Sequence, residues 1–326
     1  MGMPTTLLQA VKHFSDPDNC RAYMVARRWP NGVACPRCGS MAVYFDSSSN
    51  RWECKTRHPK RKFTLKTGTI FEDSPLGLDK WLPTVWMIAN CKNGVSSWEI
   101  HRAIGVTQKT AWFMLHRIRL AMQDTETGGK LGGDVEIDET YIGGKARNMH
   151  KKRKERAMKG ATAGMAGKVA VQGLLERHSK KGHSIVRTLV VKNTRTEQIQ
   201  TGVRANVEAG SNIYTDSLRS YKGLGPGYNG EYIHNVIDHA EKYVDGQVHT
   251  NGLENYWSLL KRALRGTYVA VEPFHLFRYL DEQAFRFNNR FEMNDADRFS
   301  LAIYGILGRR LMYQDLIAAG TATEPA

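Results

Sequence analysis

No part of the chain approaches the roughly 20 consecutive apolar residues that a membrane-spanning helix needs. The start, MGMPTTLLQAVKHF, lacks the apolar core and cleavage site of a signal peptide. Cysteine is scarce, with 5 in 326 residues, and an odd number with three of them clustered does not suit a disulfide framework. These absences predict a cytoplasmic protein with no membrane partner.

Acidic residues are the minority among the charged ones. Lys and Arg total 47 against 32 for Asp and Glu, which gives a net charge of +15. An excess of this size indicates a polyanionic partner, and the lack of a membrane segment favours nucleic acid over an anionic membrane surface. The chain also lacks a phosphate-binding loop of the form GxxxxGKS or GxxxxGKT, so we expect no nucleotide cofactor.

Composition divides the chain into six parts. They are an N-terminal segment with one amphipathic helix and a basic turn at Arg27 and Arg28 (1–29), a ribbon of short strands (30–72), a helical region (73–124), a Gly-rich linker (125–133), a region of strands and helices (134–292, with a basic excursion at 145–167), and a C-terminal helix with a disordered tail (293–326). In the fifth part we expect strands at 134–142, 168–177, 183–192 and 212–216, a helix at 194–208, and mainly helices after that. This order indicates an α/β layer architecture.

Three of the five cysteines lie in the ribbon. Cys35-Pro-Arg-Cys38 has the spacing that lets two thiolates bind one tetrahedral zinc, and Cys54 offers a third ligand. His58, after three intervening residues, is the nearest group able to complete the site. The alternative is reduced core thiols beside an exposed histidine. We predict one structural zinc, because so small a ribbon buries little core and the metal would supply its folding free energy.

The helical region contains two helices separated by a short glycine turn. Ser96-Ser97 can cap a helix that ends at Ile104, and Thr107 can cap the next one after Gly105. This layout is typical of a helix-turn-helix, in which the start of the second helix faces the major groove. An ordinary helical hairpin is the alternative. The residues predicted to contact DNA are Thr107, Gln108, Lys109 and Thr110.

Two carboxylates end strands in the α/β region. In DVEIDETYI, alternation places Asp138 on the same strand face as Glu136, just before a turn. Acids gathered on one face repel one another unless a cation or solvent relieves them. We choose Asp138 as a metal ligand, with Glu136 in reserve. Asp216 ends the strand NIYTD, although an Asp before Ser can also be only a helix cap.

A third carboxylate, Glu254, starts the helix in HTNGLENYWSLLKR. Asn251 and Glu254 fit a capping box, which alone would explain the residue. The core stripe is Leu253, Trp257, Leu260 and Leu264, and a neighbouring stripe is Glu254, Ser258, Lys261 and Arg265. An acid that holds a metal, followed on one helix face by cations that bind phosphate, suits phosphodiester chemistry.

The excursion at 145–167 holds the most basic stretch of the chain. KARNMHKKRKERAMK includes Lys151, Lys152 and Arg153. It is either a solvated, disordered loop or a DNA-binding insertion that orders on the nucleic acid.

Taken together, these motifs resemble those of bacterial insertion-sequence transposases of the DDE class, in the ISXO-type group with an N-terminal zinc ribbon. The motifs that carry the resemblance are CPRCGS, KFTLKTGTIFEDSPLGLDKW, VEIDETYIGGK, IYTDSLRSY, HTNGLENYWSLLKRALRGTY and HLFRYLDEQAFRFNNR, over about residues 20–290. The resemblance implies an RNase H-like mixed-sheet domain in which Asp138, Asp216 and Glu254 hold two Mg²⁺ or Mn²⁺ ions. Lys261 matches a basic residue seven positions after the last acid. Some members have Asn as the third ligand, so Asn251 is the alternative to Glu254.

The resemblance implies Mg-dependent cleavage of double-stranded DNA at terminal repeats, followed by transfer of the freed 3′-OH to target DNA. Lys261, Arg262 and Arg265 would contact phosphate near the scissile bond. We expect a nucleoid-associated protein that works as a dimer or larger homo-oligomer. Two alternatives remain, a non-catalytic DNA-binding regulator and a nuclease that cuts without joining.

Overall fold

The computed structural model describes residues 3–123, 129–143, 167–179, 182–226, 230–237 and 249–318. The chain divides into two compact units, one formed by Met1–Gln123 with Glu292–Ala326 and the other by Asp124–Phe291. The first combines the expected N-terminal helical segment, ribbon and helical region. It also includes the C-terminal residues that the sequence analysis set apart, because α10 (Asp295–Tyr304) packs against α3 (Leu78–Asn90).

The other helices and strands of the first unit are α1 (Leu7–Phe14), α2 (Pro17–Arg28), β1 (Val43–Asp46), β2 (Arg51–Cys54), β3 (Lys62–Phe63), α4 (Ser97–Ile104), α5 (Gln108–Met122) and α11 (Tyr313–Ile317). The expectation of a single helix before residue 29 was wrong. A second helix, α2, begins after Asp16, with Pro17 in the first helical position. Asp16 caps it, because its Oδ1 accepts a hydrogen bond from the backbone N of Asp18 at 2.8 Å. Arg27 and Arg28 lie in the last turn of α2 and not in a separate basic turn.

The ribbon is a small antiparallel sheet in the order β1-β2-β3. Its apolar side is limited to a few aromatic rings: Trp52 lies 6.1 Å from Phe63 and 5.6 Å from Trp29, measured between ring centroids. So few buried side chains leave a large part of the folding free energy to be supplied by something else.

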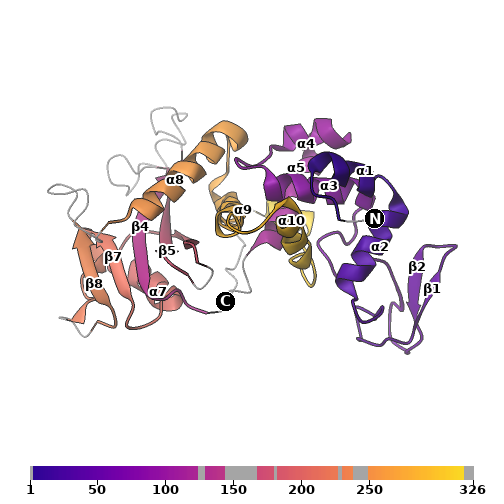
Figure 1. The fold of residues 1–326 in the computed structure, drawn as a ribbon, viewed down its shortest axis with the longest axis horizontal. Helices are drawn as coiled ribbons and strands as arrows, with labels where there is room; N and C mark the ends of the chain where they lie inside the picture. Colours follow the sequence, from indigo (N-terminus) through magenta and orange to yellow (C-terminus); the bar gives the residue numbers. More distant parts are fainter. Residues whose placement is uncertain are drawn as a thin grey trace. The chain divides into compact units, whose positions relative to one another are not determined.

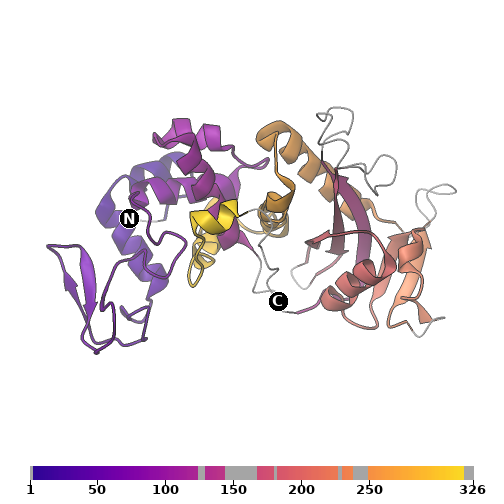
Figure 2. The same cartoon turned by 180° about the vertical axis from the view of Figure 1, so that it is seen from behind.

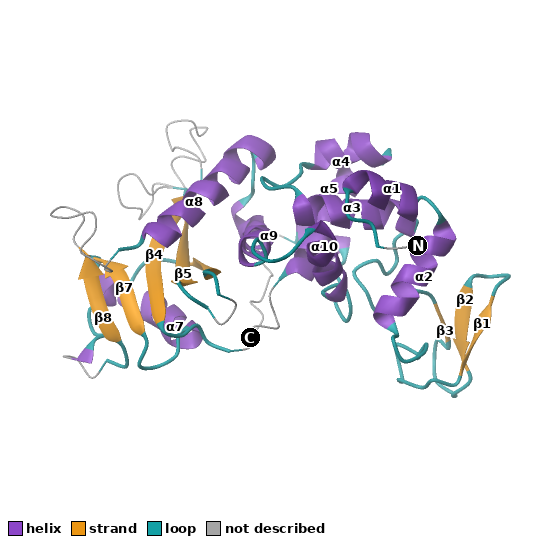
Figure 3. Ribbon diagram, in the orientation of Figure 1, coloured by secondary structure: helices purple, strands orange, loops and turns teal. Residues whose placement is uncertain are grey.

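Helices α4 and α5 begin where the sequence predicted, and α4 also ends there. Ser96 and Glu99 form a capping box at the start of α4, Gly105 ends it in the left-handed conformation with φ 64°, and Thr107 caps α5. The pair can be followed in Figure 3. The two predicted helices and the glycine turn between them are therefore present, while their assignment as a DNA-binding helix-turn-helix stays a prediction.

The second unit is built on a mixed sheet. Its elements are β4 (Asp134–Ile142), β5 (Val169–Glu176), β6 (Ile185–Val191), α7 (Thr196–Asn206), β7 (Asn212–Asp216), the 3₁₀ helix η2 (Arg219–Tyr221), β8 (Ile233–Ile237), α8 (Asn251–Ala263), the π-helical turn η4 (Leu264–Tyr268), the 3₁₀ helix η5 (Pro273–His275) and α9 (Leu276–Asn288). The strand order is β6-β5-β4-β7-β8, in which β4, β5 and β6 pair antiparallel and β4, β7 and β8 pair parallel. This is the RNase H-like mixed sheet that the resemblance implied.

Strand β8 was not predicted, because helices were expected to dominate beyond residue 216. Two of the apolar side chains of β8, Ile233 and Val236, are 54% and 52% exposed. The strand lies at an edge of the sheet, and His234 and Asn235 interrupt its apolar residues, so neither alternation nor an apolar run marks it.

Helices cover both faces of the sheet (Figures 1 and 2). On one face Val135 and Ile137 of β4 pack with Ile199 and Val203 of α7. On the other face, β5 packs under α8 and β6 packs under α9, and Trp257 belongs to that core. Because side chains alternate along a strand, Asp138 lies on the α8 face of β4. Within the described ranges, no helix combines the length and the apolar character needed to cross a membrane.

Candidate active site and zinc cluster

Parallel pairing of β4 with β7 brings two of the predicted acids to the same level of the sheet. Ile137 is paired with Thr215, so the residues that follow them, Asp138 and Asp216, stand side by side on neighbouring strands. Asp216 is the last residue of β7, as predicted, whereas Asp138 is the fifth of the 9 residues of β4, so the prediction that it ends its strand was wrong. Asp216 Oδ1 accepts a hydrogen bond from the backbone N of Leu218 at 3.1 Å. The turn-capping role considered as an alternative is therefore present together with the proximity to Asp138.

Helix α8 brings the third acid and a lysine to the same region. An open pocket includes Asp138, Glu254, Ser258 and Lys261 in its lining, together with Glu139, Thr140 and Trp257. Asp216 does not line this pocket. Asn251, the alternative third ligand, is exposed at the start of α8 and also lies outside the lining.

The electrostatics of Asp138 connect all three acids. The pKa of Asp138 is raised to about 6, mainly by burial and also by the charges of Asp216 and Glu254, against the lowering effect of a hydrogen bond from Trp257. The carboxylate oxygens of the three acids do not all lie within 4.8 Å of one another. Among the described residues, only the cysteine cluster brings three or more metal-ligating atoms that close. Like charges without a counterion repel, and a divalent cation would relieve that repulsion.

Trp257 is the residue that links α8 to the Asp138 carboxylate. Its Nε1 donates to Asp138 Oδ2 at 2.9 Å, while its ring packs so closely on β5 that a Cβ at Gly173 would lie 2.5 Å from it. The sequence analysis assigned Trp257 only to the core stripe. It is buried, as are Leu253, Leu260 and Leu264, so the predicted stripe is confirmed. Its indole N–H gives it a further role in orienting the carboxylate.

We expect Trp257→Phe to raise the pKa of Asp138 above 6, because the ring is kept while the hydrogen bond that favours the charged carboxylate is lost. A hydrogen bond to a charged group contributes about 1.5–3 kcal/mol, which corresponds to a shift of about one to two pKa units. NMR titration of the Asp138 carboxyl in buffer free of Mg²⁺ and Mn²⁺ measures it. An unchanged pKa would show that the indole does not influence this carboxylate.

Glu136, the reserve ligand, is directed elsewhere. It is 1% exposed, forms an ion pair with Arg177 at 2.9 Å, and accepts a hydrogen bond from the backbone N of Leu253 at 2.9 Å. The predicted capping box between Asn251 and Glu254 is wrong. The capping residue is Thr250, which makes no side-chain cap hydrogen bond, because Glu136 reaches the first turn of α8 from β4.

Glu139 is an acid that the sequence analysis did not single out. Burial raises its pKa to about 8, although a hydrogen bond from the buried Tyr221 hydroxyl lowers it. Strand alternation places Glu139 on the face opposite Asp138, so no periodic pattern marked it. Its place directly after Asp138 was the available signal.

The predicted DNA-contacting residues at the start of α5 already have partners within the unit. Thr107 accepts a hydrogen bond from the backbone N of Thr110 at 3.2 Å, and Gln108 Nε2 donates to Ser97 Oγ at 2.8 Å. Lys109 Nζ lies 4.7 Å from the centroid of the Tyr313 ring. Thr107 and Lys109 are exposed. Lys151, Lys152 and Arg153, together with the basic excursion except for its last residue, lie outside the described residues.

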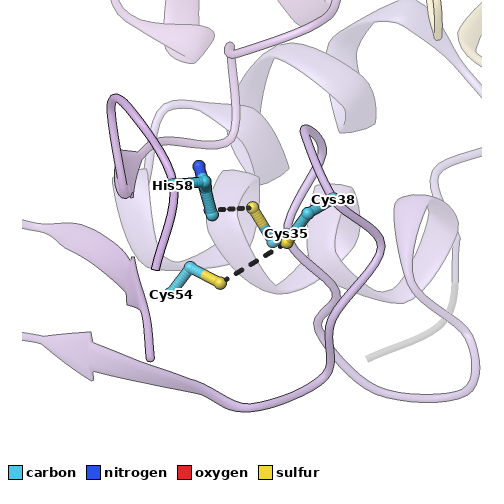
Figure 4. A group of neighbouring side chains, drawn as sticks. All are labelled: Cys35, Cys38, Cys54 and His58. Atoms are coloured by element: carbon cyan, nitrogen blue, oxygen red, sulfur yellow. Dashed lines mark hydrogen bonds between the residues drawn. The ribbon is translucent and has the colours of Figure 1, made fainter. Parts of the chain in front are cut away.

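The cysteine cluster of the ribbon is compact. Cys35, Cys38, Cys54 and His58 point toward one another (Figure 4), and their ligand atoms all lie within 4.8 Å of one another. His58 Nε2 is 3.5 Å from Cys35 Sγ, and the sulfurs of Cys38 and Cys54 are 3.6 Å apart. A tetrahedral zinc with ordinary Zn–S and Zn–N bonds separates its ligands by about 3.5–3.8 Å. The residues therefore fit zinc.

The surroundings of the cluster favour metal binding. His58 Nδ1 lies 2.8 Å from the carbonyl oxygen of Pro59, an arrangement that leaves Nε2 as the free ligand atom. Although burial opposes it, hydrogen bonds that include one from His58 lower the pKa of the Cys54 thiol to about 6, and a thiolate is the metal-binding form. The cluster and the ribbon together support one structural zinc.

Comparisons with known proteins agree with both units. The transposase zinc-ribbon domain matches residues 15–56, just short of His58, and the ISXO2-like transposase domain matches residues 130–288. These two matches, together with the RNase H-like sheet of the second unit and the cysteine cluster of the first, indicate a transposase of the DDE class. The chain belongs to the ISXO2-like transposase family.

Two relatives illustrate the match. An uncharacterized protein in transposable element ISH50 of Halobacterium salinarum is 27% identical over 266 residues, covering 79% of this chain and 86% of that protein. An uncharacterized transposase-like protein of Haemophilus influenzae is 33% identical over 104 residues, covering 32% of this chain and 81% of that protein. A solved simian T-cell lymphotropic virus intasome in complex with PP2A regulatory subunit B56 gamma overlaps 57% of this chain and 63% of its own, but at 12% identity and a TM-score of 0.27 it carries no argument.

Proposed function

We propose that this transposase cleaves DNA at the terminal repeats of its insertion sequence and transfers the freed 3′-OH ends to target DNA. The observation that carries the proposal is the shared pocket of Asp138, Glu254 and Lys261, with Asp216 beside Asp138 in the sheet register. The pocket joins acids to a cation, as phosphodiester chemistry on a polyanion requires. The net charge of +15 supports a nucleic-acid substrate.

The donor set suits hard divalent cations. Asp138, Asp216 and Glu254 supply carboxylate oxygens, which Mg²⁺ and Mn²⁺ prefer. The raised pKa of Asp138 reflects burial and negative charge that a cation would offset. These three residues would hold two such ions, which when bound supply an activated water and stabilise the leaving 3′ oxygen.

The remaining residues of the pocket position the reactants. Trp257 holds the Asp138 carboxylate, and Lys261 lies two turns along α8 from Glu254, where its ammonium can bind a DNA phosphate. Arg262 and Arg265 are exposed on the same helical segment and can continue that contact along the strand. No nucleotide cofactor is needed, because transesterification conserves the phosphodiester energy.

Recognition of terminal repeats falls, in this proposal, to the first unit. The start of α5, with Thr107, Gln108, Lys109 and Thr110, would enter the major groove. Lys151, Lys152 and Arg153 would hold the strand near the cleavage site. Because the two ends of a transposon must be held in one complex, the working form would be at least a dimer.

A strand-transfer assay separates this proposal from its nuclease alternative. The purified chain is given pre-cut terminal-repeat DNA with a free 3′-OH, target plasmid and Mg²⁺. We expect covalent joined products that depend on the 3′-OH and disappear when the end carries a 3′-dideoxy nucleotide. Cleavage of uncut DNA without any joined product would favour a nuclease, and binding without either reaction would favour a regulator.

A further inference from the structure

The second unit contains an ion pair that is almost completely removed from water. The side chains of Arg177 and Glu136 are 9% and 1% exposed, and Arg177 Nε lies 2.9 Å from Glu136 Oε1. Burying two charges is costly unless every polar atom is satisfied. His249 Nδ1 also approaches the same oxygen, at 3.5 Å. The second carboxylate oxygen of Glu136, Oε2, therefore also needs a hydrogen-bond donor.

That partner is the first turn of α8. Glu136 Oε2 accepts a hydrogen bond from the backbone N of Leu253 at 2.9 Å. With Thr250 as the capping residue, Leu253 is the third helical residue, whose N–H a cap side chain would ordinarily bind. Glu136 thus caps α8 from a different element, and its negative charge faces the positive end of the helix dipole.

The close approach depends on a glycine. A Cβ placed on Gly252 would lie 2.9 Å and 3.1 Å from the two oxygens of Glu136. Any larger residue would force the Glu136 carboxylate or the first turn of α8 to shift.

Arg177 extends the connection to the segment that enters α8. One of its terminal nitrogens donates to the carbonyl oxygen of His249 at 2.5 Å and lies 3.1 Å from His249 Nδ1. Its guanidinium lies 4.1 Å from the centroid of the Tyr214 ring on β7. Arg177 therefore contacts β4 through Glu136, β7 through Tyr214 and the segment that enters α8 through His249. These are the three elements that carry the proposed metal ligands.

We propose that Glu136 and Arg177 are positioning residues that fix Glu254 relative to Asp138. Asp138 follows Glu136 by two residues on the same face of β4, and Glu254 follows Leu253 directly on α8. The hydrogen bond between Glu136 and Leu253 is thus a second link, beside the one from Trp257 to Asp138, between the strand of one acid and the helix of another. The role in metal binding rests on the proposed function; the anchoring of α8 does not.

Hydrogen exchange of the full chain tests the anchor without any activity. In Glu136→Ala, the amides of the first turn of α8 are expected to exchange about 2- to 30-fold faster, the range that corresponds to the loss of a helix cap. Glu282→Gln is the matched control, because Glu282 forms another buried ion pair in the same unit, with Arg286 of α9. In Glu282→Gln, exchange of the amides in the first turn of α8 should not increase more than exchange in the rest of the unit. Unchanged exchange in Glu136→Ala would overturn the anchor.

Mn²⁺ binding, followed by electron paramagnetic resonance, tests the positioning. We expect Glu136→Gln and Arg177→Met to bind Mn²⁺ about 10- to 100-fold more weakly than the parent chain, the usual effect of losing a residue that supports a metal ligand. Parent affinity in both variants would overturn the positioning role. If the parent chain itself bound no Mn²⁺, the proposed function would fail, and the exchange experiment would still decide whether Glu136 anchors α8.

Discussion

Replacing Asp138 with asparagine is expected to stabilise the second unit above pH 6 while abolishing DNA cleavage. Burial is the main reason that the pKa of Asp138 is raised from 3.8 to about 6. The folded state therefore favours the protonated form. The resulting stability is fully present below the unfolded pKa and is lost as the pH rises through 6. Asparagine stays neutral, so it avoids that loss.

The difference in unfolding free energy between Asp138→Asn and the parent should grow from near zero below pH 4 to about 3 kcal/mol above pH 6, because each pKa unit corresponds to about 1.4 kcal/mol. Urea titrations at several pH values measure it, in buffer free of Mg²⁺ and Mn²⁺ but without a chelator, so that zinc stays bound. Glu231→Gln, an exposed acid of the same unit, should show no such trend. A variant less stable than the parent at pH 8 would contradict the assignment of Asp138 as a destabilised, buried ligand.

Removing a zinc ligand is expected to unfold the ribbon. The metal contributes about 10–16 kcal/mol to comparable small zinc domains, far more than the few aromatic contacts of β1, β2 and β3 can replace. Cys35→Ser should lower bound zinc from about one per chain, and the ribbon amides should lose their protection from hydrogen exchange. Metal analysis and exchange mass spectrometry measure both effects.

Cys91→Ser is the matched control, because Cys91 follows α3 and lies outside the cluster. It should keep its zinc. His58→Ala tests the fourth ligand separately. It should weaken zinc binding while the three cysteine ligands remain. Unchanged zinc in Cys35→Ser would rule out the proposed ligand set.

The features predicted correctly from the sequence are those with local signals. The spacing of Cys35 and Cys38, the caps at Ser96 and Thr107, and the apolar stripe of α8 each depend on residues within a few positions of one another. Such patterns each constrain one element, and the apolar stripe was enough to define α8, which carries Glu254.

The features that were missed depend on contacts distant in sequence. From the sequence, Glu136 is only another acid on the strand of Asp138. Its buried ion pair with Arg177, 41 residues away, could not be predicted from neighbouring residues. Its bond to Leu253 spans 117 residues and makes the local capping box unnecessary. The return of the C-terminal residues to the first unit likewise depends on distant contacts, including hydrogen bonds from Arg117 to Leu311 and from Asn90 to Asp295.

The most direct test of the central claim is cleavage of terminal-repeat DNA by Asp216→Asn in the presence of Mg²⁺. We expect the parent chain to cut the transposon end and the variant to lose at least about 10²–10³-fold in rate, the usual effect of removing one group that stabilises the transition state. DNA affinity should stay within about twofold, since Asp216 ends β7 in the second unit, whereas the helices assigned to repeat recognition belong to the first. Cleavage by Asp216→Asn at the parent rate, with binding retained, would contradict the account.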